Sequence, residues 1–345
     1  MAGRAAGYPA RVRTTGDTGA PAPSSVPSGA LGDGAEECVA RARQLVAAVG
    51  TLPHPGRGRT IERWQALAEV AHADLSIARI VEGHHDALAI LGDLGAGPEP
   101  DGLLGVWAAR PGELRAAPDD GGWILDGAKP YCSGADLLDA AVVTAVTDGG
   151  PMLFLVTPGD GEVVPGSWSP LGMAATRSAT LRFDQVALAG TAAVGTPSAY
   201  VDRPGFGHGG CGVAACWWGG ATRLLRDVGA VLHDDDLALV EFGRAAAGLD
   251  HVARFLGDAA AQFDRHPEDA ALAAGLAVPV RAAAAEAAHE VLGLAARQLG
   301  TSVLGHDRTV AGRIGDLTTY LTQHRPAAAV DVGRWHLAQP ARPLC

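Results

Sequence analysis

Between about residues 34 and 98, apolar residues recur at three- and four-residue spacing, which is typical of amphipathic helices. The stretch AEECVARARQLVAAVG predicts a helix that ends at Gly50, a frequent C-cap residue. TIERWQALAEVAHA predicts a second helix with Thr60 as N-cap, and DLSIARIVEGHHDALAILGDLG predicts a third, which Gly83 can break. Residues 1–33 are rich in Gly, Pro, Ala, Ser and Thr without an apolar period, so we expect a disordered leader there.

The apolar period changes to two between about residues 99 and 195, where short β-rich runs alternate with Gly, Pro and Asp. This pattern predicts an antiparallel β domain, and the dipeptide Asp126-Gly127 predicts a hairpin turn inside it. Helical spacing returns over residues 205–340 and predicts helices at 209–231, 235–264, 268–300 and 307–323. Pro279 predicts a kink or break in the third of them. Segregated helices, strands and helices indicate an α+β fold.

The chain has 345 residues, of which 48% are apolar, and a net charge of −11. This acidic balance argues against a nucleic-acid groove and against a polybasic membrane contact. No apolar run approaches the roughly 20 residues that a membrane span needs. The five cysteines form no CxxC pair and have no ligand-like spacing to histidines. We therefore expect no membrane, nucleic-acid or metal partner, and reduced thiols in the cytoplasm.

Four stretches together carry a family resemblance. They are LAEVAHADLSIARIVEGHHDALAIL, GWILDGAKPYCSGADLLDAAVVTA, PLGMAATRSATLRFDQVAL and AARQLGTSVLGHDRTVAGRIGDLTTYLTQHR. In these stretches the chain resembles the acyl-CoA dehydrogenases, as a divergent member. The resemblance spans about residues 60–335. It implies an N-terminal helical region (34–98), a middle β domain (99–195) and a C-terminal four-helix bundle (205–340), with FAD bound between them.

The resemblance implies a flavin site around the segment KPYCSGAD. It assigns the Ser133 hydroxyl to the N5 edge of the flavin and Tyr131 to a flank of the ring, with Cys132 between them. It places Trp107 and Ala108 in the family's flavin-contacting loop, although the family's Gly-Ser-Asp is missing there. The residues by themselves also fit a strand corner in which Tyr131 packs and Ser133 caps the strand.

At the other end of the cofactor, the resemblance assigns Gln298, Gly300 and Thr301 of RQLGT to the adenine side of FAD. In this motif Thr301 replaces the family's second glycine. The alternative for this segment is an ordinary helix end, because Gly300 suits a C-cap.

The catalytic base is the third implied feature. Many family members carry a carboxylate eight residues after the aspartate that corresponds to Asp316, where this chain has His324. Its pKa range suits a general base, so His324 is the candidate catalytic residue. A histidine here is also similar to the flavin monooxygenase branch of the same fold. A helix-terminal histidine stabilised by the helix dipole is the structural alternative.

The helix that contacts CoA in the family reads GHGGCGVAACWWGGA here and has lost its polar contact residues. Its glycine-rich run fits close helix packing better than a phosphate-binding loop. The sequence thus predicts an FAD-dependent oxidoreductase of a CH–CH unit in an acyl-like substrate, small or carrier-linked, other than a standard fatty acyl-CoA. A flavin monooxygenase and a catalytically degenerate scaffold subunit are the alternatives. The resemblance implies a homodimer or homotetramer, with an electron-transfer partner or a paralogous subunit possible.

Overall fold

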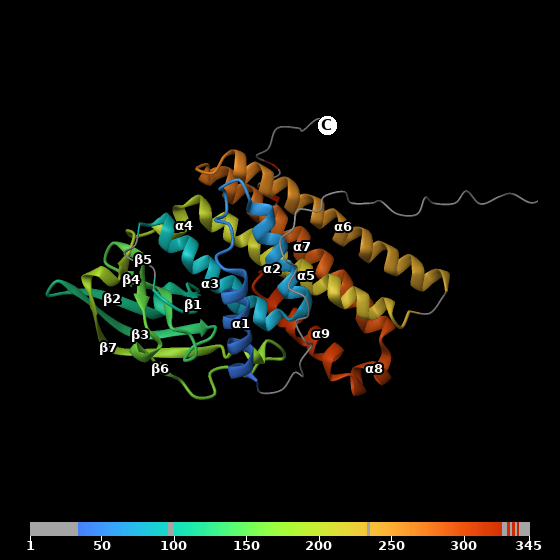
Figure 1. Ribbon diagram of the computed structural model, residues 1–345, viewed down its shortest axis with the longest axis horizontal. Helices are drawn as coiled ribbons and strands as arrows, with labels where there is room; N and C mark the ends of the chain where they lie inside the picture. Colours follow the sequence, from blue (N-terminus) through green and yellow to red (C-terminus); the bar gives the residue numbers. More distant parts are fainter. Residues whose placement is uncertain are drawn as a thin grey trace, which may run out of the picture.

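The computed structural model describes residues 34–95, 100–232, 235–325, 330–331, 333–334 and 337, so the predicted leader lies outside the described residues. Three parts follow one another along the chain (Figure 1). A β sheet forms one end of the molecule, long helices form the other, and three N-terminal helices lie against both.

The N-terminal helices are α1 (Ala35–Val49), α2 (Thr60–Ala73) and α3 (Leu75–Asp93). Helix α1 ends at Gly50 as predicted, whereas Thr60 is the first residue of α2 rather than its N-cap. Helix α3 begins where the Asp74 carboxylate accepts a hydrogen bond from the Ile77 N–H at 2.9 Å. It runs unbroken through Gly83, so a break there is ruled out.

One mixed sheet contains the eight strands of the described residues, in the order β6-β7-β3-β2-β4-β5-β8 with β1 paired to β4. They are β1 (Leu104–Trp107), β2 (Leu114–Asp119), β3 (Gly122–Cys132), β4 (Ala140–Thr147), β5 (Gly150–Val156), β6 (Glu162–Val163), β7 (Ala179–Ala189) and β8 (Ala193–Val194). The α+β class is confirmed. Within it, the sheet is not wholly antiparallel, because β4 pairs in parallel with β1 and β2.

The predicted hairpin turn at Asp126-Gly127 is wrong. Strand β3 continues through this dipeptide, and its pairing with β7 shifts register between Leu125 and Gly127, which is a bulge. The turn lies six residues earlier, at Asp120-Gly121, where β2 and β3 pair up to Asp119 and Gly122. Gly121 and Gly127 both have positive φ, a conformation that glycine adopts without strain. The same Asp-Gly dipeptide can therefore form either a turn or a bulge.

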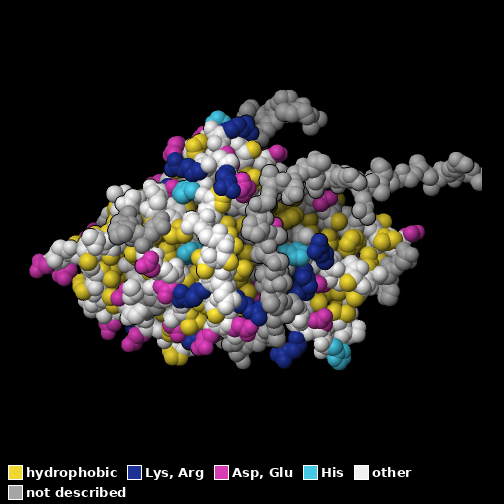
Figure 2. All heavy atoms as spheres, viewed as in Figure 1, with side chains coloured by type: hydrophobic (Ala, Val, Ile, Leu, Met, Phe, Trp, Pro, Cys, Tyr) yellow, Lys and Arg dark blue, Asp and Glu magenta, His cyan; other side chains and the backbone are white. Residues whose placement is uncertain are grey.

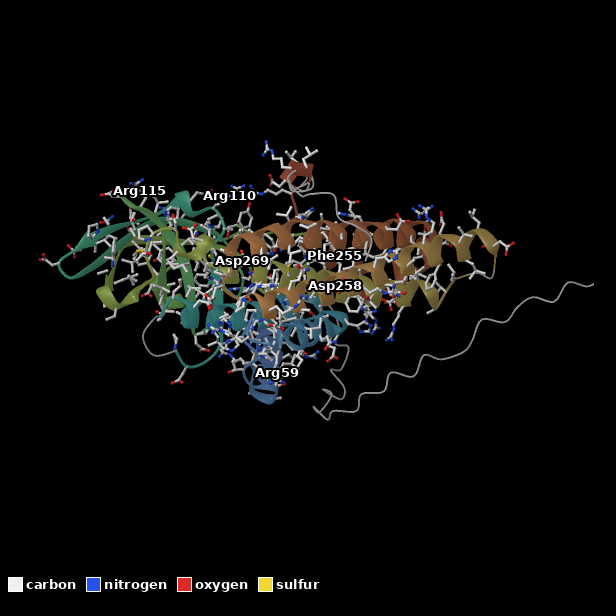
Figure 3. The ribbon with its side chains drawn as sticks, turned by 90° about the horizontal axis from the view of Figure 1, so that it is seen from above. Arg59, Arg110, Arg115, Phe255, Asp258 and Asp269 are labelled. Atoms are coloured by element: carbon white, nitrogen blue, oxygen red, sulfur yellow. The ribbon has the colours of Figure 1, made fainter. Side chains whose placement is uncertain are left out.

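The remaining helices are α4 (Ala199–Asp202), α5 (Pro204–Gly229), α6 (Asp236–Arg265), α7 (Ala270–Gln298), α8 (Gly300–His306) and α9 (Arg308–Leu321). Seen from above, the long helices lie along one another with the sheet at one end (Figure 3). Helix α7 runs through Pro279 without the predicted break. Side chains of Asp235, Asp269 and Asp307 cap α6, α7 and α9.

By length and composition alone, α7 could cross a membrane, contrary to the expectation that no apolar run approaches this length. In the fold it packs against both α5 and α6. Its buried residues include Leu276, Val280 and Leu294, so part of its apolar surface belongs to the core of the fold. Figure 2 shows acidic side chains gathered around the outer end of the β domain, in keeping with the acidic sequence.

The glycine-rich run lies inside α5 and allows close helix packing, as predicted. A Cβ on Gly207 would lie 2.5 Å from the Ala273 carbonyl oxygen of α7, and a Cβ on Gly219 would collide with the Ala68 carbonyl of α2. These glycines bring α5 against two neighbours at once, which side chains would prevent.

Helix α9 holds the β domain against the bundle. The Asp316 carboxylate accepts a hydrogen bond from the Met173 N–H, and the Thr319 hydroxyl accepts one from the Gly172 N–H at 2.9 Å. Burial raises the pKa of Asp316 to about 6, although the Met173 N–H opposes this shift. This joint fixes the loop before β7 against α9.

Candidate active site

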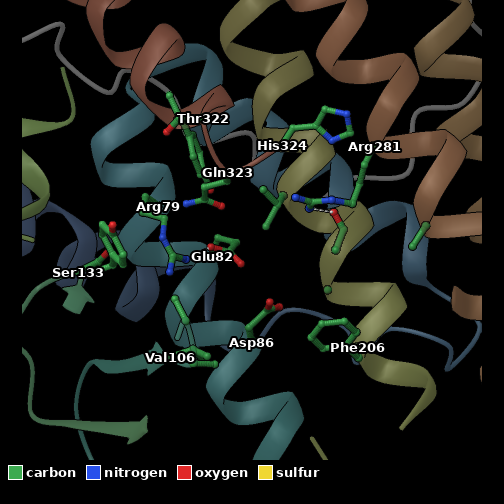
Figure 4. Close-up of a pocket in the computed structure, with 18 of the residues that line it drawn as sticks. Arg79, Glu82, Asp86, Val106, Ser133, Phe206, Arg281, Thr322, Gln323 and His324 are labelled. Carbon is green, nitrogen blue, oxygen red and sulfur yellow. Dashed lines mark hydrogen bonds and ion pairs between the residues drawn. The ribbon is translucent and has the colours of Figure 1, made fainter. Parts of the chain in front are cut away.

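A cavity of about 820 Å³ lies where the sheet meets α3, α5, α7 and the end of α9. Figure 4 shows its labelled side chains. In this view Ser133 lies on one side, Arg281 and His324 lie on the other, and Arg79 and Glu82 lie between them. We call the β-strand side the strand wall and the side formed by α3, α5, α7 and the α9 end the helical wall.

Ser133 and Tyr131 line the strand wall, as the sequence analysis expected. The pairing of β3 with β7 shifts register between Lys129 and Cys132, and Tyr131 has φ of +63°. This left-handed conformation is uncommon outside glycine and often marks a functional site. It leaves the Tyr131 ring 46% exposed, with the guanidinium of Arg110 5.4 Å from its centroid.

Hydroxyl groups continue behind Ser133 and make a short chain. The Ser178 hydroxyl donates to the Ser133 hydroxyl at 3.3 Å and lies 2.9 Å from that of Thr176, which donates to the Met173 carbonyl at 2.7 Å. When Ser133 accepts from Ser178, its own proton is available to a group in the cavity.

Ala108 also lines the strand wall, and buried groups fix its position. The Thr144 hydroxyl donates to the Ala108 carbonyl at 3.0 Å, and the Lys129 ammonium donates to the same Thr144 hydroxyl at 2.6 Å. Burial lowers the pKa of Lys129 to about 8. Sequence reasoning did not single out this lysine, although it stands in the GAKPYCSG segment.

Trp107 and Cys132, two further candidates, lie behind the strand wall and do not line the cavity. Trp107 is 1% exposed, and its indole N–H donates to the Ser133 carbonyl at 2.9 Å. The Cys132 thiol is fully buried and donates to the Lys129 carbonyl at 3.2 Å. Trp107 thereby holds Ser133 in place from below.

His324 lies just beyond α9 and lines the helical wall. Its ring packs edge-on against Trp217 with centroids 6.0 Å apart. Burial, together with the nearby Arg281, lowers the pKa of His324, while Glu286 opposes that shift. At neutral pH the imidazole is therefore uncharged and can accept a proton.

Helix α3 supplies charged side chains that the sequence analysis did not select. Arg79 forms an ion pair with Glu82, and Asp86 pairs with Arg63 of α2 at 2.8 Å. Burial raises the pKa of Glu82 to about 8, which Asp86 reinforces and Arg79 opposes. Gly209 of α5 makes room here, since a Cβ on it would lie 2.9 Å from an Asp86 carboxylate oxygen. The signal in the sequence was four charged positions on one otherwise apolar helix.

Gln298, Gly300 and Thr301 do not line this cavity. The Gln298 side-chain amide donates to the Glu241 carboxylate of α6 at 3.3 Å, and Gly300 and Thr301 are exposed. Gly300 has φ of +56° at the junction between α7 and α8. Within one chain, the structure therefore separates these three residues from Ser133 and His324.

Comparison with known proteins comes from structure alone, because no protein-family model and no curated sequence matches the chain. The dibenzothiophene monooxygenase TdsC from Paenibacillus sp. A11-2 is similar at a TM-score of 0.70 and 21% identity, over 90% of this chain and 97% of TdsC. KijD3, solved with FMN and a dTDP-linked amino-keto sugar, is similar at 0.68 and 19%, over 90% and 94%.

Glutaryl-CoA dehydrogenase from Mycobacterium smegmatis is similar at a TM-score of 0.70 and 19% identity, over 91% of each chain. These similarities extend along nearly the whole chain and include both the sheet and the bundle. The chain therefore has the acyl-CoA dehydrogenase fold.

Proposed function

We propose that the chain is a flavin-dependent oxidoreductase whose cavity holds the flavin ring along the strand wall. The main observation behind this proposal is the position of Ser133, which lines the cavity. When its hydroxyl accepts the hydrogen bond from Ser178, it can donate its own proton to a bound group. Flavin, when bound, supplies the two-electron redox chemistry.

Two further features fit a flat, polar group at the strand wall. Trp168 lines the cavity, and its indole N–H is buried without a hydrogen-bond partner among the described residues. A buried donor of this kind requires an acceptor. Ala108, Ala109 and Arg110 place consecutive backbone groups along the same wall, where Ala108 is fixed through Thr144.

We propose FAD as the cofactor, with FMN as the competing choice. Both share the ring and differ in the adenine half, for which the sequence assigned Gln298, Gly300 and Thr301. Those residues do not line the cavity of their own chain, so an adenine group on them requires a second copy of the chain. FAD bound in this way therefore implies a homodimer or homotetramer. FMN needs no such contact, and both TdsC and KijD3 have been solved with FMN.

The substrate we propose is a small or carrier-linked, acyl-like molecule other than a fatty acyl-CoA. The helical wall next to the ring site carries Arg79, Glu82 and Asp86. A hydrocarbon chain bound there would displace water from these polar groups without replacing its hydrogen bonds, which is unfavourable. His324, uncharged at neutral pH, is the candidate proton acceptor. Electrons would leave through an electron-transfer partner. Buried free thiols at Cys38, Cys132, Cys211 and Cys216 fit the cytoplasm as the location.

The first experiment incubates the purified chain with FAD or FMN, removes free flavin by desalting and records the visible spectrum. We expect flavin to be retained, and Ser133→Ala to weaken its binding by about 2- to 10-fold, which corresponds to one hydrogen bond. Ser169→Ala, an exposed serine that does not line the cavity, is the matched control. A chain that retains neither flavin refutes the proposal and favours a scaffold subunit.

A flavin monooxygenase is the second candidate, which His324 favours because no carboxylate stands at that position. The monooxygenase TdsC shares the fold. Two assays distinguish the candidates. A monooxygenase consumes oxygen when a reductase supplies reduced flavin, whereas a dehydrogenase reduces a dye in the absence of oxygen. In either reaction His324→Gln should reduce turnover, whereas the exposed His251→Gln on α6 should not. Equal turnover in both variants would remove His324 from the mechanism.

A further inference from the structure

Arg325, at the end of α9, is the exposed charged side chain of the helical wall, and the charged side chains buried in or behind this wall fall into two groups. Three guanidinium groups have a carboxyl partner: Arg79 with Glu82, Arg63 with Asp86 at 2.8 Å, and Arg203 with Asp93 at 2.6 Å. In each pair a carboxyl oxygen accepts a hydrogen bond from the guanidinium. These pairs leave little attraction for a charged ligand.

Arg281 of α7 differs from them, since no carboxylate of the described residues lies within ion-pair distance of it. Its guanidinium donates to the Gly210 carbonyl at 2.7 Å and stacks 4.6 Å from the centre of the Trp217 ring. Burial lowers the pKa of Arg281, which expresses the same cost of holding an unmatched charge away from water. A guanidinium has five N–H donors, so most of them remain available.

The surroundings of Arg281 leave its guanidinium open to the cavity. Residue 210 on α5 is a glycine, so no side chain extends from α5 toward Arg281 at this point. A Cβ on Gly210 would lie only 3.5 Å from the Arg281 Cδ. Ala274, Ala277 and Val278 of α7 line the cavity next to it with small apolar groups. In Figure 4, Arg281 projects toward His324, on the side of the cavity away from Ser133. A buried cation that has no carboxyl partner, next to small apolar groups, selects for an anion.

We propose that Arg281 binds an anionic group of the substrate, a carboxylate or a phosphate. Its planar fork can bind two oxygens of either group at once. An anion held there places the rest of the substrate between His324 and the strand wall. The inference rests on the proposed function, because it names the substrate class for the same cavity.

The flavin phosphate is an anion too, and it could reach the same cation. The view in Figure 4 favours the substrate, because Ser133, the expected partner of the ring, lies across the cavity from Arg281. The two sources are distinguished by measuring anion binding with and without bound FMN.

The test is calorimetric titration with inorganic phosphate and with hexanoate at constant ionic strength, on the chain with and without FMN. We expect at least one probe to bind in both conditions. Arg281→Gln should weaken its binding at least tenfold, and Arg281→Lys should weaken it less. Arg254→Gln, an exposed arginine of α6, should match the wild type. Circular dichroism establishes that each variant is folded.

Three results would overturn the inference: neither probe binds the wild type, Arg281→Gln binds the probe as well as the wild type, or FMN competes with the probe. The last assigns Arg281 to the flavin phosphate. The titration without FMN does not depend on flavin retention, so the anion site and the flavin site can fail independently.

Discussion

The two walls of the cavity are built in different ways. The strand wall offers mainly hydroxyls, the Trp168 indole and the backbone of residues 108–110, and its one charged side chain, Arg110, is exposed. The helical wall combines residues from α3, α5, α7 and the end of α9, and its charged groups are buried or half-buried except for the exposed Arg325. A neutral wall needs only local geometry, whereas a charged wall needs partners from distant elements.

This difference affects stability as well as binding. Along the strand wall, Ser133 and the Ala108 carbonyl are held by hydrogen bonds of ordinary strength between neutral groups. Along the helical wall, one substitution leaves a buried charge unmatched. We therefore expect substitutions in the helical wall to cost more than those in the strand wall.

The largest effect is expected for Arg63→Met, which removes the partner of Asp86. Arg63 is 2% exposed and forms the ion pair at 2.8 Å. Loss of one partner of such a pair should lower the free energy of unfolding by about 3–5 kcal/mol. Urea denaturation measures it, with the exposed Arg254→Met as control. A loss as small as that of the control would show that the pair is unimportant.

Gly207→Ala should have the next largest effect, through packing rather than charge. The added Cβ would lie 2.5 Å from the Ala273 carbonyl oxygen, so α5 and α7 must separate. We expect a loss of about 1–3 kcal/mol in unfolding free energy. Gly243→Ala on α6 has open space around its Cβ and should instead gain up to about 1 kcal/mol. Similar values for both would contradict the close contact.

Glu82→Gln should change how stability depends on pH. The folded pKa of Glu82 is about 8 and lies above its unfolded value, so the folded state holds the proton more tightly. Stability from this group is therefore present at low pH and falls as pH rises toward 8. Between pH 6.5 and 8, the wild type should lose about 1–2 kcal/mol more than Glu82→Gln.

The buried histidines do not disturb this comparison. Burial lowers the pKa of His84 and His208 to about 4, so both are neutral in the folded state above pH 6.5, and their titration in the unfolded state is the same in wild type and variant. His54, whose pKa Asp93 raises, contributes equally to wild type and variant. Parallel curves of unfolding free energy for wild type and Glu82→Gln would refute a protonated Glu82.

Ser178→Ala in the strand wall should have the smallest effect. It removes the hydroxyl that lies 3.3 Å from Ser133 and 2.9 Å from Thr176, without leaving a charge. A loss of about 0.5–1.5 kcal/mol is expected in urea denaturation. A loss as large as that of Arg63→Met would invalidate the contrast between the walls.

Local sequence patterns located many of the helices and strands. They could not distinguish two local structures that have the same sequence pattern. Asp120-Gly121 and Asp126-Gly127 carry the same dipeptide, but the pairing of β3 with β2 makes the first a turn, and the pairing of β3 with β7 makes the second a bulge. Pro279 removes one hydrogen bond from α7, yet packing against α5 and α6 keeps the helix continuous.

The candidate site divides along the same line. Ser133 and Tyr131 were found through the family resemblance of one contiguous segment, KPYCSGAD, whose residues by themselves also fitted a strand corner. Arg79, Glu82, Asp86 and Arg281 were missed, since charged residues on an amphipathic helix usually face water. Nothing in the spacing of these residues shows that α5 and α7 bury that face.

The sequence by itself determined the order of helices, strands and helices, and the hydroxyl and aromatic groups of the strand wall. Periodicity and turn chemistry act over a few residues, so one chain segment contains them. Only the tertiary structure decided which charges are buried, which are paired, and that Arg281 faces the cavity without a carboxylate among the described residues. The cost of burying a charge depends on neighbours tens to hundreds of residues away, which no local pattern specifies.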